Sequence, residues 1–248
     1  MTNVCKNFFY YIKKTRIFIK AAIVFFLITI ASLVSGIMQM SEYTLEEFLG
    51  SLDTCTMFST ITIIVLVAIS LGNEFKHKTS YYLVMNGHSR SEIFFGKLIA
   101  VLPYILLLGI IQCIIMYALL VSMTGSEFVS ENIHHYLLNS LDFIIIYISY
   151  AILSLSFSFM TRSTIGGIGG SIIVIIVYNV IYLLFGYLTN FNMFSYKFNE
   201  MFGMFTFRYL LVHNNDISFQ LSILALYILL SAVYMLIGYN KFRKDDLI

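Results

Sequence analysis

Few residues of this 248-residue chain have types and spacings suited to catalytic or phosphate chemistry. Neither an HExxH nor a GxSxG pattern is present, and no pair of carboxylates is spaced for acid–base catalysis. Gly96 and Lys97 are adjacent, but a phosphate-binding loop needs another glycine five residues before Gly96, and none stands there. The sequence therefore predicts neither a catalytic site nor a nucleotide site in this chain.

Metal ligands are also not grouped. His134 and His135 are adjacent, so on a helix their side chains point about 100° apart, and no cysteine or carboxylate stands at ligand spacing from them. The three cysteines, Cys5, Cys55 and Cys113, are an odd number and lie within or beside apolar runs. We interpret them as small packing residues, and we expect this chain to bind no metal or cofactor.

The elements that must position any functional residue are membrane helices. Hydrophobic residues make up 59% of the chain and charged residues 11%, whereas a soluble domain carries roughly 25% charged residues. The apolar residues form runs of about 18 or more without Asp, Glu, Lys, Arg or His, long enough to cross a bilayer as helices. We expect an all-α polytopic membrane protein with one domain, 1–248. Its six predicted spans cover about 21–38, 54–72, 98–122, 143–160, 165–187 and 219–239.

The cations are distributed unevenly between the two sides of this predicted bundle. Thirteen of the 15 Lys and Arg residues precede the first span, follow the last, or lie in the loops after the second and fourth spans. The other three loops contain only Lys197 and Arg208. By the positive-inside rule, both termini are predicted to be cytoplasmic. A net charge of only +2 without a basic, aromatic-interleaved stripe argues against nucleic-acid binding.

Two segments outside the predicted spans are rich in aromatic residues. Residues 1–20 mix aromatics with five cations, which is typical of a helix lying in the lipid headgroup layer, and we expect a sharp angle into the first span. Residues 188–218 are too apolar for a solvated loop and too often interrupted for a span. They fit either a re-entrant hairpin or an amphipathic helix on the outer surface.

The loop at 73–92 carries several helix start and stop signals. Glu74 and Lys78 are four residues apart in the order that favours an ion pair on a helix. Asn86–Gly87 can end a helix by adopting a positive φ, and Ser89-x-x-Glu92 is a capping box that opens the next helix. The pattern predicts a short helix, a turn at glycine and entry into the third span.

At this loop the chain resembles the permease family of ABC-2 type exporters. Lys78 stands where the family usually has glycine, and Gly87 where it often has proline. The likeness extends to the interfacial N-terminal helix, the six spans and the segment before the last span. The matching motif residues, in the same order and spacing, are Glu74, Thr79, Leu83, Ser89, Arg90, Gly96 and Lys97.

The resemblance implies that residues 74–90 form a coupling helix that docks into a separate ATPase subunit. ATP and Mg would then bind to that partner, and two permease copies, identical or related, would pair with two ATPases in a bacterial cytoplasmic membrane. A solvated basic loop is the alternative interpretation of this segment. The expected contact has a charged rim of Glu74, Lys76, Lys78 and Arg90, an apolar centre of Phe75, Tyr81, Tyr82 and Leu83, and the motif residue Thr79.

Small and polar residues within the spans indicate how the helices pack. Gly166 and Gly170 have a small-xxx-small spacing at the start of the fifth span, and Ser154 and Ser158 lie at the end of the fourth. We interpret them as helix-packing residues. Gln112 is polar and deep in the third span, so it needs a hydrogen-bond partner.

Transport powered by a partner is the function that these features favour. The spans contain no ionisable group with which to couple transport to an ion gradient, so the leading hypothesis is the permease subunit of an ATP-driven exporter of a peptide, drug or amphiphile. Two alternatives are the substrate-binding subunit of a vitamin importer and an intramembrane enzyme. The sequence assigns no substrate-contact residue.

Overall fold

The computed structural model describes residues 2–39, 45–124, 133–189 and 217–244. Within these residues the chain is helical and contains no strand, as the all-α prediction requires. Residues 190–216 lie outside this part, so the re-entrant or surface segment predicted at 188–218 stays a prediction. The helices are α1 (Thr2–Thr15), α2 (Ile17–Gln39), α3 (Leu45–Lys76), α4 (Thr79–Met85), α5 (Arg90–Thr124), α7 (Ile133–Thr161), α8 (Thr164–Thr189) and α11 (Ile217–Lys244).

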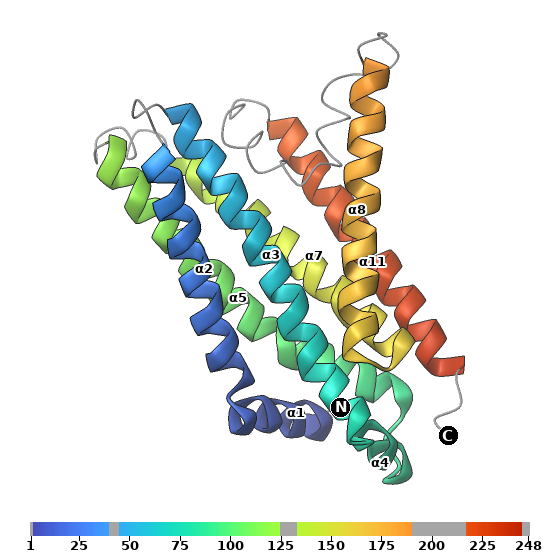
Figure 1. Cartoon of the computed structure of the whole chain (residues 1–248). Helices are drawn as coiled ribbons and strands as arrows, with labels where there is room; N and C mark the ends of the chain where they lie inside the picture. The colour runs from blue at the N-terminus through green and yellow to red at the C-terminus, as the bar shows by residue number, and fades with distance from the viewer. Residues whose placement is uncertain (1, 40–44, 125–132, 190–216, 245–248) are drawn as a thin grey trace.

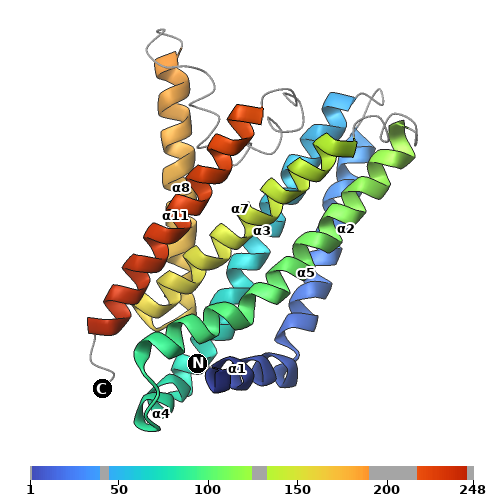
Figure 2. The same ribbon diagram turned by 180° about the vertical axis from the view of Figure 1, so that it is seen from behind.

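The long helices form a bundle whose successive members run in alternate directions (Figures 1 and 2). Helix α7 packs against four other helices, α3, α5, α8 and α11. Helices α1 and α4, together with the end of α11, lie at the same end of the bundle. The short helices and the start and end of the described chain are therefore gathered on one side.

Helix α1 lies across that end of the bundle, nearly at right angles to α2 (Figure 1). Arg16, between the two helices, has a φ of 52°, a left-handed conformation that interrupts helical geometry. Val4, Phe8 and Ile12 recur every four residues and are buried. Val4 packs on Gly96 of α5, where an added Cβ would lie 3.1 Å from the valine Cγ1. The expected sharp angle between the two helices is thus present, and the face of α1 that carries Val4, Phe8 and Ile12 packs against the bundle.

Four helices contain segments long and apolar enough to cross a membrane, by length and composition. Among the described residues, α2 and α8 contribute shorter apolar stretches, Phe18–Ala31 and Thr164–Tyr178. The chain is therefore suited to a membrane, while the first and fifth predicted spans stay predictions. The four segments are Thr56–Lys76, Arg90–Ala118, Phe143–Thr161 and Leu224–Lys244.

Small residues bring α3, α7 and α8 close together. A Cβ added at Gly166 or Gly170 would collide with Thr161 or Phe157, the α7 residues opposite them. Ser154 is fully buried in α7 and donates a 2.8 Å hydrogen bond to the backbone oxygen of Ile64 in α3. These contacts place the glycines and serines singled out in the sequence at helix–helix interfaces, where small side chains let backbones approach.

Gln112 finds its partner on α7. Its side-chain oxygen accepts a 2.7 Å hydrogen bond from the hydroxyl of Tyr147, and both side chains are buried. This bond links α5 to α7 at a depth where no water would compensate an unpaired amide.

Two glycine-to-alanine substitutions should shift stability in opposite directions. At Gly238 of α11 a Cβ would lie 2.7 Å from the Cβ of Ser156 and 2.8 Å from its Cα, so the α7 backbone would have to move. At Gly169 nothing lies within 4 Å. Gly238→Ala should cost about 1–3 kcal/mol, whereas Gly169→Ala should stabilise by up to about 1 kcal/mol through helix propensity. Thermal unfolding in detergent measures both, and equal shifts of the same sign would contradict the packing.

Candidate functional site

Two residues with positive φ separate α4 from the helices on either side. Helix α3 ends at Lys76, and Lys78 has a φ of 55° before α4 begins at Thr79. After Met85, Gly87 has a φ of 85°. The predicted stop at glycine is confirmed. The loop expected at 73–92 is shorter than predicted, because α3 continues to Lys76 and α5 begins at Arg90.

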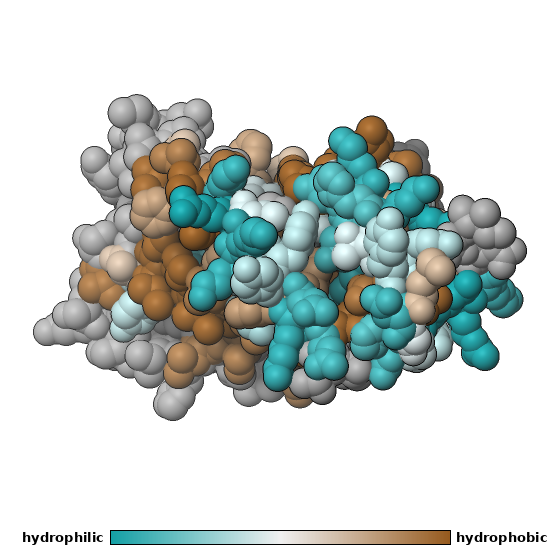
Figure 3. Space-filling view, turned by 90° about the horizontal axis from the view of Figure 1, so that it is seen from below, coloured by the Kyte–Doolittle hydropathy of each residue, from teal (hydrophilic) through white to brown (hydrophobic). Residues whose placement is uncertain are grey.

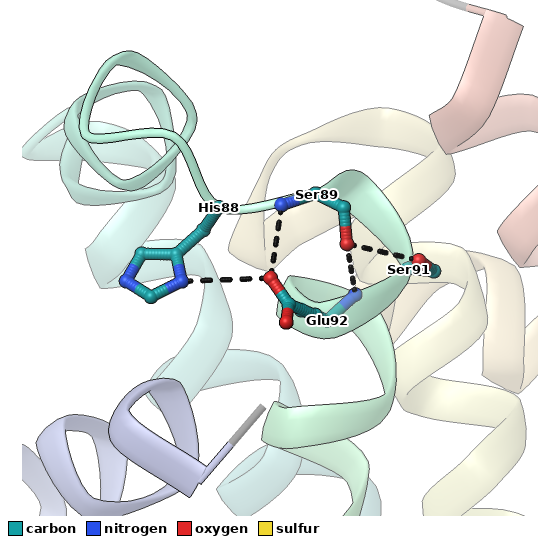
Figure 4. Close-up of polar contacts among 4 residues, drawn as sticks. All are labelled: His88, Ser89, Ser91 and Glu92. Carbon is teal, nitrogen blue, oxygen red and sulfur yellow. Dashed lines mark hydrogen bonds and ion pairs between the residues drawn. The ribbon is translucent and has the colours of Figure 1, made fainter.

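The predicted capping box opens α5 (Figure 4). The backbone N–H of Glu92 donates a 3.2 Å hydrogen bond to Ser89 Oγ, and the backbone N–H of Ser89 donates a 3.1 Å bond to Glu92 Oε2. His88 Nδ1 lies 3.6 Å from the same carboxylate oxygen. These reciprocal bonds satisfy donors that a helix start leaves free, and they fix where α5 begins.

A buried ion pair lies beneath α4. The Nζ of Lys97, in α5, pairs with Glu74 Oε2 near the end of α3 and donates a 2.6 Å hydrogen bond to Ser80 Oγ in α4. The side chain of Lys97 has 0% exposure and that of Glu74 has 4%. One ammonium group therefore connects three consecutive helices of the chain.

Aromatic rings surround this ammonium group. The Lys97 Nζ lies 5.7 Å from the ring centre of Phe8 in α1, 5.3 Å from that of Phe75 in α3 and 5.6 Å from that of Phe159 in α7. Such distances allow cation–π attraction. Phe94 and Phe242 extend the cluster, because their ring centres lie 4.8 Å and 4.7 Å from that of Phe159. Six helices, α1, α3, α4, α5, α7 and α11, thus contribute to this cluster.

The composition of the site follows from the cost of burying charge. A buried ion is tolerated only when a counter-ion and hydrogen bonds replace the water that it has lost. Here Glu74 supplies the opposite charge, Ser80 an acceptor and the rings their negative faces. Because the two opposite charges are enclosed and lie on different helices, this pair is suited to holding α3 and α5 together.

Tyr11 on α1 lies near the same pair. Burial raises the pKa of its phenol, and the negative charge of Glu74 raises that pKa further, while a hydrogen bond with Asn73 acts in the opposite direction. The phenol is consequently neutral at physiological pH. Its surroundings show that α1 meets the end of α3 as well as α5.

Arg90 joins the start of α5 to the end of α11. Its Nη1 donates hydrogen bonds to the backbone oxygens of Phe242, at 3.2 Å, and Arg243, at 2.6 Å. The last carbonyls of a helix lack partners within the helix and carry partial negative charge, so a guanidinium is well suited to them. Arg90 therefore holds the last helix against the helix that follows α4.

The structure places the nine expected contact residues in three environments, and Tyr81, which is 38% exposed, is one of the exposed residues. Glu74 pairs with Lys97 instead of Lys78, because α3 ends at Lys76 and Lys78 lies beyond the helix break. Glu74 thus does not stand on an exposed rim, which corrects that part of the expectation. Lys76, Lys78 and Tyr82 are exposed, Phe75, Thr79, Leu83 and Arg90 are half-buried, and Glu74 is buried.

The exposed side of α4 is aromatic and apolar. Tyr82 is 59% exposed, Met85 67% and Tyr81 38%, whereas Ser80 is the one buried residue of this helix. Figure 3 views this end of the molecule, where hydrophilic residues predominate and hydrophobic ones lie beside them. An exposed cluster of aromatics and methionine within a polar surface is the composition expected of a protein–protein contact.

Sequence reasoning named Lys97 as a motif residue but missed its pairing with Glu74, and it singled out neither Ser80 nor Met85. Lys97 comes directly before the uncharged run 98–122. Glu74, which has the opposite charge, comes just after the preceding predicted span, 54–72. Two opposite charges that flank a short connection in this way are a signal for a pair between the two helices. Neither the burial of Ser80 nor the exposure of Met85 has such a signal.

Removing Glu74 should destabilise the whole protein. Glu74→Ala leaves the ammonium of Lys97 buried without a counter-ion, which typically costs about 3–5 kcal/mol. Glu74→Leu combined with Lys97→Met removes both charges and should retain most of the stability. Lys76→Ala, at an exposed neighbouring position, is the control and should change stability by less than about 0.5 kcal/mol. Thermal unfolding compares the three, and a Glu74→Ala protein as stable as the control would contradict the buried pair.

Lys78 should tolerate glycine better than any branched residue. Its φ of 55° lies in the left-handed region, which costs an L-residue about 1–2 kcal/mol relative to glycine. Lys78→Gly should therefore stabilise slightly or have no effect, whereas Lys78→Val should destabilise by more than 1 kcal/mol, on the order expected for a β-branched residue there. Unfolding midpoints of the two variants test this order, and the reverse order would show that α4 begins differently.

Comparison with known proteins does not assign the chain to a family. No protein-family model matches the sequence, and a search of the curated proteins found no match either. We therefore infer the function from the geometry of α4 and of the buried pair beneath it.

Proposed function

We propose that this chain is the membrane-spanning permease subunit of an ATP-driven exporter of the ABC-2 type. The observation that carries the proposal is α4, a seven-residue helix set between two residues of positive φ at the polar end of the bundle. It presents Tyr81, Tyr82 and Met85 outward. A short helix held in this way offers a compact docking surface for a second protein.

The membrane arrangement that goes with this function has six spans. Helices α2 and α8 would be the first and fifth, beside the four segments that meet the length and hydropathy criterion. The end that carries α1, α4 and the basic end of α11 would face the cytoplasm of a bacterial cell, since cations favour that side. Helix α1 would lie in the headgroup layer, with Lys13 and Lys14 exposed.

The energy for transport would come from the partner. A cytoplasmic ATPase subunit would bind ATP and Mg and would contact α4, and two permease copies, identical or related, would form the transport unit. The cargo class that fits is a peptide, drug or amphiphile. Among the described contacts, none favours either alternative, the vitamin-capturing importer subunit or the intramembrane enzyme.

The exposed face of α4 provides the direct test. The chain would be co-expressed with candidate ATP-binding subunits, beginning with any that is encoded beside its gene, and recovered by affinity pull-down. Replacing both Tyr82 and Met85 by alanine should reduce ATPase recovery at least about tenfold, as loss of central contact residues does. Tyr10→Ala, at a 64% exposed aromatic of α1 on the same end of the molecule, is the matched control and should leave recovery unchanged. Wild-type chain that recovers no ATPase, or equal recovery with the double variant, would overturn the proposal.

A further inference from the structure

Helix α4 has few attachments to the rest of the protein. It has seven residues, and residues of positive φ, Lys78 and Gly87, lie before and after it. Ser80 is its one buried residue, and Leu83 and Val84 pack partly against the core. A helix this short has little stability of its own, so its position depends on the contacts that Ser80, Leu83 and Val84 make.

Lys97 holds the deeper of these contacts. Its Nζ is the donor to Ser80 Oγ at 2.6 Å and at the same time the partner of Glu74. The same ammonium lies within 6 Å of ring centres in α1, α3 and α7. Ser80 is therefore bonded to a group that belongs to α5 and is held by contacts with α1, α3 and α7.

We propose that Lys97 is a positioning residue that fixes α4 on the bundle through Ser80, and that a displacement of α4 reaches α3, α5 and α1 through this bond. The attachment is a property of the chain alone. Only the source of the displacement, an ATPase moving against Tyr82 and Met85, rests on the proposed function.

The chemistry of the contact explains why a lysine stands in an otherwise apolar cluster. An apolar side chain could fill the space among the phenylalanine rings, but it could not hold Ser80 at one distance and direction. A charge-assisted hydrogen bond is short and directional, and it is stronger in an enclosed site than in water. Glu74 supplies the opposite charge that a buried ammonium donor requires, which gives the ion pair a role beyond packing.

Hydrogen–deuterium exchange of residues 79–85 in the purified full-length chain, reconstituted in lipid nanodiscs, tests the attachment. Ser80→Ala should speed exchange in α4 at least about tenfold, the factor expected for loss of one charge-assisted hydrogen bond. Ser80→Thr keeps a hydroxyl and should restore the protection. Ser70→Ala removes another buried hydroxyl, one that bonds only within α3, and should leave α4 unchanged. Unchanged exchange with Ser80→Ala, or equal acceleration with Ser70→Ala, would overturn the proposal.

A second variant tests the same proposal while Ser80 is left unchanged. Glu74→Leu with Lys97→Met removes the donor and leaves no unpaired charge, so the fold should persist. Exchange of α4 should accelerate as it does in Ser80→Ala, although Ser80 itself is intact. Protection equal to that of the wild type would show that Leu83 or the flanking backbone holds α4, and would overturn the role of Lys97.

Transport assays with the recovered ATPase separate the two proposals. Ser80→Ala leaves Tyr82 and Met85 in place, so ATPase recovery should be unchanged, while efflux of a fluorescent amphiphilic drug per ATP hydrolysed should be largely lost. Ser80→Thr should restore that ratio. A normal ratio in Ser80→Ala despite faster exchange would overturn transmission through Lys97. Failure of the wild type to recover any ATPase would overturn the proposed function and leave the exchange result standing.

Discussion

The full burial of one ammonium group is the constraint on which this end of the molecule depends. Lys97 can stay charged inside the protein only because a carboxylate, a hydroxyl and aromatic faces surround it. Those groups come from helices far apart in the sequence, and Phe159 from α7 is among them. The groups that replace water around this charge therefore bring α1, α3, α4, α5 and α7 together at one point. A change in the position of one of these helices would disturb the contacts of the others.

The rest of the bundle is held by interactions of a different kind. Away from Lys97 the helices meet through small residues such as Gly167 and Gly238, and through single hydrogen bonds such as that from Tyr147 to Gln112. In a lipid environment such contacts gain from close packing and not from the hydrophobic effect. The bundle thus combines one electrostatic centre near its polar end with packing contacts along its length. A displacement of helices at the polar end would therefore change the contacts of Lys97 before it changed the packing contacts along the bundle.

The polar end also joins elements that the chain order keeps apart. Arg90 bonds to the carbonyl oxygens at the end of α11, and the Phe242 ring lies in the same aromatic cluster as Phe94 and Phe159. Helix α4 is connected to this assembly through Ser80, while its aromatic face points outward. A partner that binds this face would act on a helix that is linked through Lys97 and Phe159 to the first and last of the described helices.

Local sequence determined much of this architecture. The apolar runs, the stop at Gly87 and the capping box from Ser89 to Glu92 depend on neighbouring residues, and composition alone indicated apolar helices suited to a membrane. Tertiary structure decided the partner of Glu74. Sequence spacing pointed to Lys78, but α3 ends before it, and the carboxylate meets Lys97 across the α3–α5 contact. The positions of Glu74 and Lys97 on either side of a short connection are compatible with a pair, but the way in which the helices meet in space decided which charges pair and are buried.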